Sequence, residues 1–115
     1  MFEIWHNPRC SKSREALAIL EEAGVEVKVR LYLEESPDPA ELDRVLNALD
    51  IEPRDLVRLG EAAAKDSDLS NRGLSRSEWI DAMVAAPILI ERPVVIRDDG
   101  RAVLGRPPEK VRALL

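Results

Sequence analysis

Apolar residues recur along the chain with two different periods, and these periods divide it into strands and helices. Residues 1–6 are short and apolar and run into an Asn-Pro turn signal, which predicts a strand. Helical spacing follows over 13–23, and Gly24 stands where a left-handed C-terminal residue is favoured. From 25 to 31 apolar and charged residues alternate, which is typical of an edge strand with one solvated face. The chain therefore opens with a β-α-β unit.

The middle of the chain is predicted to be mostly helical. A Pro-Asp-Pro sequence opens an apolar helical stripe that runs from 42 to 49, and Pro53 suits the first turn of another helix. The polar segment 60–75 predicts a short helix and a mobile loop. The Ser-Arg-Ser-Glu sequence at 75–78 resembles a helix cap and precedes an apolar helical face at 79–84.

The end of the chain predicts a hairpin and a final helix. Apolar residues at 93–96 and 102–104 flank an Asp-Asp-Gly-Arg turn, which is a strong hairpin signal. A Pro-Pro pair then opens a helix with Val111, Leu114 and Leu115 on its buried side.

This order of elements predicts the α/β class. A β-α-β unit, a mostly helical insertion over 37–90, a β-hairpin and a C-terminal helix are the order of a thioredoxin-like mixed β-sheet. The length of 115 residues suits a single domain, 1–115, with that insertion inside it.

Composition narrows the function classes. There are 17 Lys and Arg against 22 Asp and Glu, and a net charge of −5 has the wrong sign for a nucleic-acid partner. One cysteine and one histidine can form neither an internal disulfide nor a thiolate metal site. No apolar run is long enough to span a membrane, and no export signal is present, so a cytoplasmic protein without a membrane partner is expected.

The candidate chemistry lies around Cys10. Residues 6–14 include His6, Arg9, Lys12 and Arg14 and no acid, although the chain is acidic overall. If a helix begins just after Cys10, its free N–H groups and dipole stabilise a thiolate, which makes Cys10 a candidate nucleophile. A buried cysteine that only packs is the alternative. No second cysteine exists to resolve an oxidised intermediate, so an external thiol, chiefly glutathione or a small redoxin, is needed.

Four further side chains are candidates for the same site. His6 could favour the thiolate as an imidazolium or as a hydrogen-bond donor, or it could be a strand-end histidine satisfied by the backbone. Arg58, Arg92 and Arg106 each stand at an element end among apolar residues. Guanidinium groups suit tetrahedral oxyanions because they donate two hydrogen bonds and stay charged. The alternative for these arginines is surface ion pairing with carboxylates.

Three motifs together resemble the glutaredoxin-coupled arsenate reductase family. They are His6-Asn7-Pro8-x-Cys10-Ser11-Lys12-Ser13-Arg14, Pro87-Ile88-Leu89-Ile90-Glu91-Arg92-Pro93 and Gly105-Arg106-Pro107. The resemblance covers nearly the whole chain and implies a thioredoxin-like fold with an inserted helical region. It also implies reduction of arsenate to arsenite with glutathione and glutaredoxin as reductants, and no tightly bound cofactor or metal.

The resemblance also implies roles for single residues. Cys10 would attack arsenate, and His6 would help to keep its sulfur ionised. Arg58, Arg92 and Arg106 would bind the oxyanion. Ser13 and Arg14 match polar positions of the active-site loop, where Ser13 could hydrogen-bond the thiolate. Pro93 falls where thioredoxin-like folds hold a cis proline beside the active cysteine.

Two other functions remain open on the sequence. One is a glutathione-dependent thiol-disulfide reductase with the same fold, which would need no oxyanion site. The other is a non-catalytic protein that binds a transcription complex through its helical middle, which would leave the basic segment around Cys10 unexplained.

Overall fold

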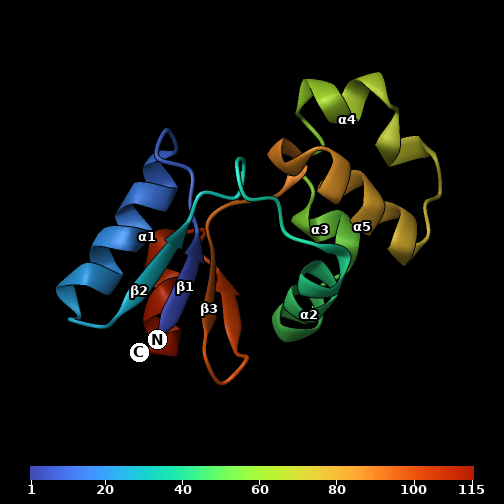
Figure 1. Cartoon of the computed structure of the whole chain (residues 1–115). Coiled ribbons are helices and arrows are strands. Elements are labelled where there is room, and N and C mark those ends of the chain that lie inside the picture. Colours follow the sequence, from blue (N-terminus) through green and yellow to red (C-terminus); the bar gives the residue numbers. More distant parts are fainter. The chain divides into compact units, whose positions relative to one another are not determined.

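The computed structural model describes all residues, 1–115, and the chain divides into two units (Figure 1). The first unit comprises Met1–Glu35 and Arg92–Leu115, and the second comprises Ser36–Glu91. The chain therefore leaves the first unit once and rejoins it before the last two strands. No helix in the structure has the length and apolar character that crossing a membrane requires.

A four-stranded mixed sheet forms the centre of the first unit. Its strands are β1 (Phe2–Trp5), β2 (Val27–Arg30), β3 (Val94–Arg97) and β4 (Ala102–Leu104), in the spatial order β2-β1-β3-β4. β1 and β2 are parallel, whereas β3 pairs antiparallel with both β1 and β4. The β-α-β unit, the C-terminal hairpin and the mixed α/β fold predicted from the sequence are confirmed, and β2 is an edge strand as expected.

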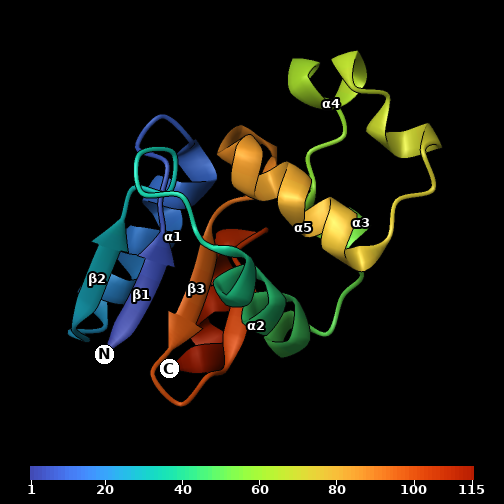
Figure 2. The same ribbon diagram turned by 45° about the vertical axis from the view of Figure 1, so that its right-hand side comes forward.

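One face of the sheet carries the core of the first unit. Helix α1 (Ser11–Glu22) and the 3₁₀ helix η3 (Pro108–Leu114) pack against each other on this face (Figure 2). The buried residues of this core come from all of these elements: Phe2, Ile4, Ala16, Leu20, Val95, Val111 and Leu114. They alternate along the strands and recur at helical spacing, which is why the sequence pattern locates these elements.

The other face of β1 carries Trp5, which is buried. The indole N–H of Trp5 donates to the Glu3 carboxylate at 3.0 Å, and the Arg30 guanidinium lies 5.8 Å from the centre of the Trp5 ring. Val29 is exposed, whereas Val27 and Leu31, the apolar residues two positions before and after it, are half-buried. β2 is an edge strand and has no neighbouring strand on its outer side.

The second unit is helical. Its elements are α2 (Pro39–Leu49), α3 (Pro53–Leu56), α4 (Ala62–Asp66), η1 (Leu69–Asn71), α5 (Arg76–Ala85) and η2 (Pro87–Leu89). Reciprocal capping boxes open both long helices, with Asp38 and Glu41 at α2 and Ser75 and Glu78 at α5. An isolated antiparallel bridge joins Val57 to Ile90 and brings the end of α3 beside the end of the unit.

The C-terminal helix differs from the expectation in one respect. Leu115 is exposed, although its position in an α-helical pattern places it with Val111 on the buried side. The segment is a 3₁₀ helix, in which residues three apart lie on one face. Val111 and Leu114 therefore point into the core together, and Leu115 is turned away from it.

Candidate active site

The register of the sheet brings three distant segments to one end of the first unit. Trp5, the last residue of β1, pairs with Val94, the first residue of β3. Val94 in turn pairs with Leu104, the last residue of β4. The segment after β1, which leads to Cys10, therefore starts at the same end of the sheet where Arg92-Pro93 enters and Gly105-Arg106 leaves. Of the predicted site residues, His6, Cys10, Ser13, Arg14, Arg92 and Arg106 belong to this unit.

The segment from β1 to α1 is a tight turn that places Cys10 at the start of the helix. The Asn7 carbonyl accepts a hydrogen bond from the Cys10 N–H at 3.0 Å, and the Asn7 side-chain oxygen accepts one from the Arg9 N–H at 3.0 Å. Cys10 is the N-cap residue of α1, with an extended backbone, and its free thiol is half-buried. The expectation that the helix begins directly after Cys10 is confirmed.

Arg14 lies in the first part of α1 and hydrogen-bonds back to the segment that precedes Cys10. Its guanidinium donates to the Pro8 carbonyl at 2.8 Å, and its backbone N–H donates to the Cys10 carbonyl at 3.0 Å. The first turn of α1 contains no acidic residue. The segment around Cys10 is thus held by backbone and guanidinium hydrogen bonds, and the first turn of the helix adds no carboxylate to it.

Ser13 and His6 form a buried pair beneath this turn. The Ser13 Oγ lies 2.6 Å from the His6 Nδ1 and also accepts a hydrogen bond from the Asn7 N–H at 3.0 Å. Both side chains are buried. Burial lowers the pKa of His6 below its ordinary value, and the nearby Arg14 charge lowers it further. The neutral imidazole is therefore favoured over the imidazolium, and its direct partner is Ser13.

Arg92 and Arg106 are joined to each other through the backbone. The Arg106 guanidinium donates to the Arg92 carbonyl at 3.1 Å, and the Gly105 N–H donates to the Pro93 carbonyl at 2.9 Å. The Arg92-Pro93 bond is cis, as the resemblance implies, and the Arg106-Pro107 bond is cis as well. The Arg92 Nε is buried and has no hydrogen-bond partner in the protein. A buried donor of this kind is costly to leave unpaired. An anionic ligand that accepts a hydrogen bond from the Arg92 Nε would remove this cost, which favours binding of the anion.

Arg58 lies in the second unit and is paired with carboxylates there. Its guanidinium forms a short ion pair with Glu61, and its Nε lies 3.7 Å from the Glu91 carboxylate. All three side chains are half-buried. The structure thus shows for Arg58 the ion pairing that the sequence left open as the alternative to oxyanion binding.

Two features of this end of the sheet were not found from the sequence. One is the Ser13–His6 bond, whose seven-residue spacing follows neither a helix nor a strand period. The other is the close approach of Gly105 to Pro93, where a Cβ on residue 105 would lie 2.8 Å from the proline ring. In the sequence, only the single Gly105 between a predicted strand and Arg106-Pro107 indicates this close approach.

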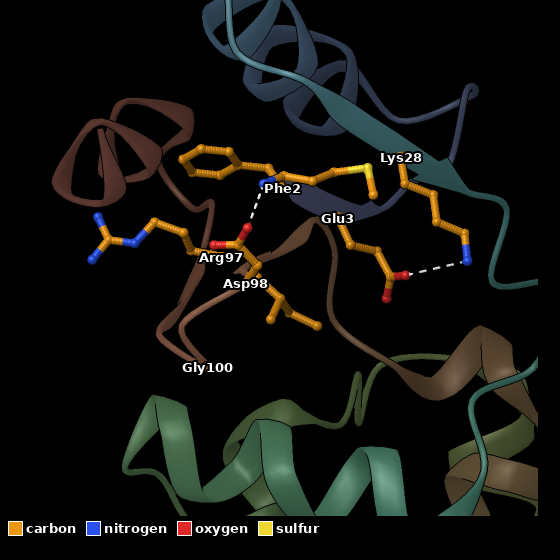
Figure 3. Close-up of a pocket in the computed structure, with 8 residues that line it drawn as sticks. Phe2, Glu3, Lys28, Arg97, Asp98 and Gly100 are labelled. Carbon is orange, nitrogen blue, oxygen red and sulfur yellow. Dashed lines mark hydrogen bonds and ion pairs between the residues drawn. The ribbon is translucent and has the colours of Figure 1, made fainter.

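A pocket of about 330 Å³ lies at the opposite end of the sheet and contains none of the predicted site residues (Figure 3). Its charged groups pair among themselves: Asp98 lies 2.6 Å from the amino group of Met1, and Lys28 lies 3.7 Å from Glu3. The amino group lowers the pKa of Asp98. These pairs leave the pocket without an evident role in thiol or oxyanion chemistry.

The fold and the site together define a class of protein. It is a thioredoxin-like α/β protein in which a single cysteine occupies the N-cap of the first helix and arginines enter from the strands beside it. No group of three or more His, Cys, Asp or Glu side chains is arranged to hold a metal ion.

Comparisons with known proteins agree with this class. The ArsC family model matches residues 5–114. The uncharacterized protein YfgD of Escherichia coli is 48% identical over 95% of this chain and 92% of its own, and an arsenate reductase of Haemophilus influenzae is 42% identical over 97% of each. The structure of an arsenate reductase from Vibrio cholerae superimposes with a TM-score of 0.94 at 44% identity, over 99% of this chain and 97% of that one. The chain belongs to the ArsC family.

Proposed function

We propose that this protein reduces arsenate to arsenite, with Cys10 as the nucleophile and glutathione and glutaredoxin as the reductants. The observation that carries the proposal is the arrangement at one end of the sheet. The Cys10 turn begins at the same end of the sheet as the segments of Arg92 and Arg106, and the Arg92 Nε is a buried donor without a partner. The proteins of Haemophilus influenzae and Vibrio cholerae that this chain resembles are named arsenate reductases.

The first step forms a covalent bond between the enzyme and the substrate. The Cys10 sulfur attacks arsenic(V), a sulfur–arsenic bond forms, and one arsenate oxygen leaves as water after taking up protons. Arg92 and Arg106 hold the remaining oxygens, because a guanidinium keeps its charge and donates hydrogen bonds in a planar fork. The hydrogen bonds of Ser13 to His6 and to the Asn7 N–H hold the turn that contains Cys10 in position.

The second step reduces arsenic. The glutathione sulfur attacks the Cys10 sulfur, the sulfur–arsenic bond breaks with its electron pair on arsenic, and arsenite leaves. Cys10 is then in a mixed disulfide with glutathione. A glutaredoxin thiol attacks the glutathione sulfur and releases the Cys10 thiolate for another cycle. Overall, one arsenate and two thiols give one arsenite, one disulfide and one water. This reductant supply suits the cytoplasm, where thiols are kept reduced.

No second cysteine in this chain can take the place of glutathione in that cycle, because Cys10 is the only cysteine in the sequence. The same fact leaves a glutathione-dependent disulfide reductase as the second candidate function. Such an enzyme shares the Cys10 turn but has no use for the oxyanion donors.

Arsenate-dependent oxidation of NADPH, coupled through glutathione reductase, glutathione and glutaredoxin, tests the proposal. The wild type is expected to turn over with arsenate, and Cys10→Ser is expected to have no activity. Serine is a favourable N-cap residue, so Cys10→Ser should retain the thermal unfolding midpoint of the wild type. Turnover by Cys10→Ser would contradict the mechanism. Turnover of a glutathione-linked disulfide without any response to arsenate would favour the second candidate.

A further inference from the structure

Some cations of the first unit are held by carboxylates, and others, such as Arg9, Lys12 and Arg101, form no ion pair. Lys28 and Arg30 lie within ion-pair distance of Glu3, and Arg97 binds Asp99 at 2.5 Å. Arg9 and Lys12, in contrast, are exposed and form no ion pair. They stand on either side of Cys10 in the sequence, in a protein whose net charge is −5.

These two cations are not needed to build the turn. The backbone N–H of Arg9 donates to Asn7, but its guanidinium has no hydrogen-bond partner in the structure, and neither does the Lys12 ammonium group. Arg14, by comparison, has its guanidinium on the Pro8 carbonyl. Arg9 and Lys12 therefore keep their full hydrogen-bonding capacity for a ligand that approaches Cys10 from solvent. We call this pair the basic rim.

We propose that the basic rim recognises the carboxylates of the thiol that attacks the Cys10 sulfur. This inference rests on the proposed function, in which an external thiol must reach Cys10. Glutathione carries two carboxylates and one ammonium group, so it is a net anion at neutral pH. Two exposed cations beside the sulfur raise the local concentration of such an anion and orient it by hydrogen bonds. A neutral thiol gains nothing from them.

The covalent step that the basic rim assists can be observed without arsenate. Cys10 is first converted to a mixed disulfide with 4-thiopyridine by reaction with 4,4′-dithiodipyridine, and the only cysteine in the chain is Cys10. The glutathione sulfur then bonds to the Cys10 sulfur, the Cys10–pyridine disulfide bond breaks, and thiopyridone leaves with the thiol proton. The absorbance of thiopyridone gives the rate. The same measurement with 2-mercaptoethanol gives the rate for a neutral thiol.

The test compares the ratio of the glutathione rate to the 2-mercaptoethanol rate in three proteins. In the double variant Arg9→Gln/Lys12→Gln this ratio is expected to fall about three- to tenfold, because exposed ion pairs each contribute modestly. Added salt should lower the ratio in the wild type and have little effect in the double variant. Arg101→Gln is the matched control, since it removes an exposed cation from the hairpin at the opposite end of the sheet. Its ratio should equal that of the wild type.

Three outcomes would overturn the proposal. The first is an unchanged ratio in the double variant. The second is an equal fall of both rates, which would mean that the cations act on the Cys10 sulfur and not on the incoming thiol. The third is an equal effect of Arg101→Gln, which would assign the effect to net charge. Because no arsenate is present, failure of arsenate turnover and failure of the basic rim are observed separately.

Discussion

At the scale of single residues, the Ser13 hydroxyl has one proton and two hydrogen-bond partners, the His6 Nδ1 and the Asn7 N–H. The Asn7 N–H donates to the Ser13 Oγ. The single proton of the Ser13 hydroxyl can be donated to one acceptor. The lowered pKa of His6 favours a neutral ring, whose Nδ1 at 2.6 Å either accepts that proton or donates its own. In the second case the Ser13 O–H is released for another acceptor at this end of the sheet. Ser13 thus ties the end of β1 to the first turn of α1 in either tautomer.

Replacement of Ser13 by alanine is expected to lower the free energy of unfolding by about 1–3 kcal/mol. The change leaves the Asn7 N–H and the His6 Nδ1 without the partner they share. Urea unfolding of Ser13→Ala against wild type measures this cost. Ser11→Ala is the matched control, because Ser11 is exposed at the start of the same helix and alanine is a good helix former. Equal stabilities of the two variants would contradict a role for the Ser13–His6 bond.

The pKa of His6 predicts how stability depends on pH. Burial, followed by the Arg14 charge, lowers the pKa of His6 in the folded protein below 6.5. Between the folded and unfolded values the unfolded chain binds more protons than the folded one, so stability rises with pH through this range. Acidification from pH 7 to pH 5 should therefore destabilise the wild type more than His6→Gln. The measurement is urea unfolding of both proteins at several pH values, and parallel profiles would show that His6 does not titrate as argued.

At the scale of elements, the sequence predicts best where local chemistry alone decides the structure. The capping box at Ser75 and Glu78, the edge strand and the hairpin were predicted because each depends on residues a few positions apart. The capping box at Asp38 and Glu41 was not predicted, although the Pro-Asp-Pro start of its helix was. Gly24 and Gly100 adopt the positive φ angles that their turns require. The C-terminal segment was not predicted to be a 3₁₀ helix, since Val111 and Leu114 suit either kind of helix, and only Leu115 distinguishes them.

The Gly105–Pro93 contact leads to a prediction for the elements that carry Arg92 and Arg106. A Cβ on residue 105 would lie 2.8 Å from the Pro93 Cγ and 3.3 Å from Val111, so Gly105→Ala should cost about 1–3 kcal/mol of stability by overpacking. The displaced strand end should also weaken oxyanion binding. Urea unfolding measures the first effect. Gly60→Ala is the matched control, because nothing lies within 4 Å of that Cβ position, and its stability should be unchanged or slightly raised.

At the scale of the whole molecule, the candidate site depends on pairing between segments almost a hundred residues apart. The sequence identifies Cys10, Arg92 and Arg106 by residue type and motif, but only the register of β1, β3 and β4 shows that their segments share one end of the sheet. Long-range pairing of this kind has no local signal. Glu91 as a partner of Arg58 could not be identified for the same reason, because it is far from Arg58 in the sequence, whereas Glu61 is only three residues away. Oxyanion binding by Arg58 stays a prediction that the family resemblance carries.

The oxyanion site itself can be tested through the reactivity of Cys10. If Arg92 and Arg106 hold the substrate, arsenate, phosphate and sulfate should occupy the site and slow alkylation of Cys10 by iodoacetamide at constant ionic strength. Loss of a charge-assisted, two-pronged contact costs about 1.5–3 kcal/mol, so Arg92→Ala and Arg106→Ala should weaken the protecting affinity about ten- to a hundredfold. Arg92→Lys should recover only part of it, because an ammonium group has no planar fork.

The comparison that decides between the two candidate functions is the pattern of protection across these proteins. An arsenate reductase requires protection in the wild type that is lost in Arg92→Ala and Arg106→Ala but kept in Arg101→Ala, whose side chain lies on the hairpin at the other end of the sheet. A disulfide reductase requires no oxyanion site, so its Cys10 should be alkylated at one rate with or without these anions. Absence of protection in the wild type, or equal protection in all variants, would remove both arginines from the mechanism. The buried Arg92 Nε would then have no ligand to explain it, and the disulfide reductase would be the better description of the Cys10 turn.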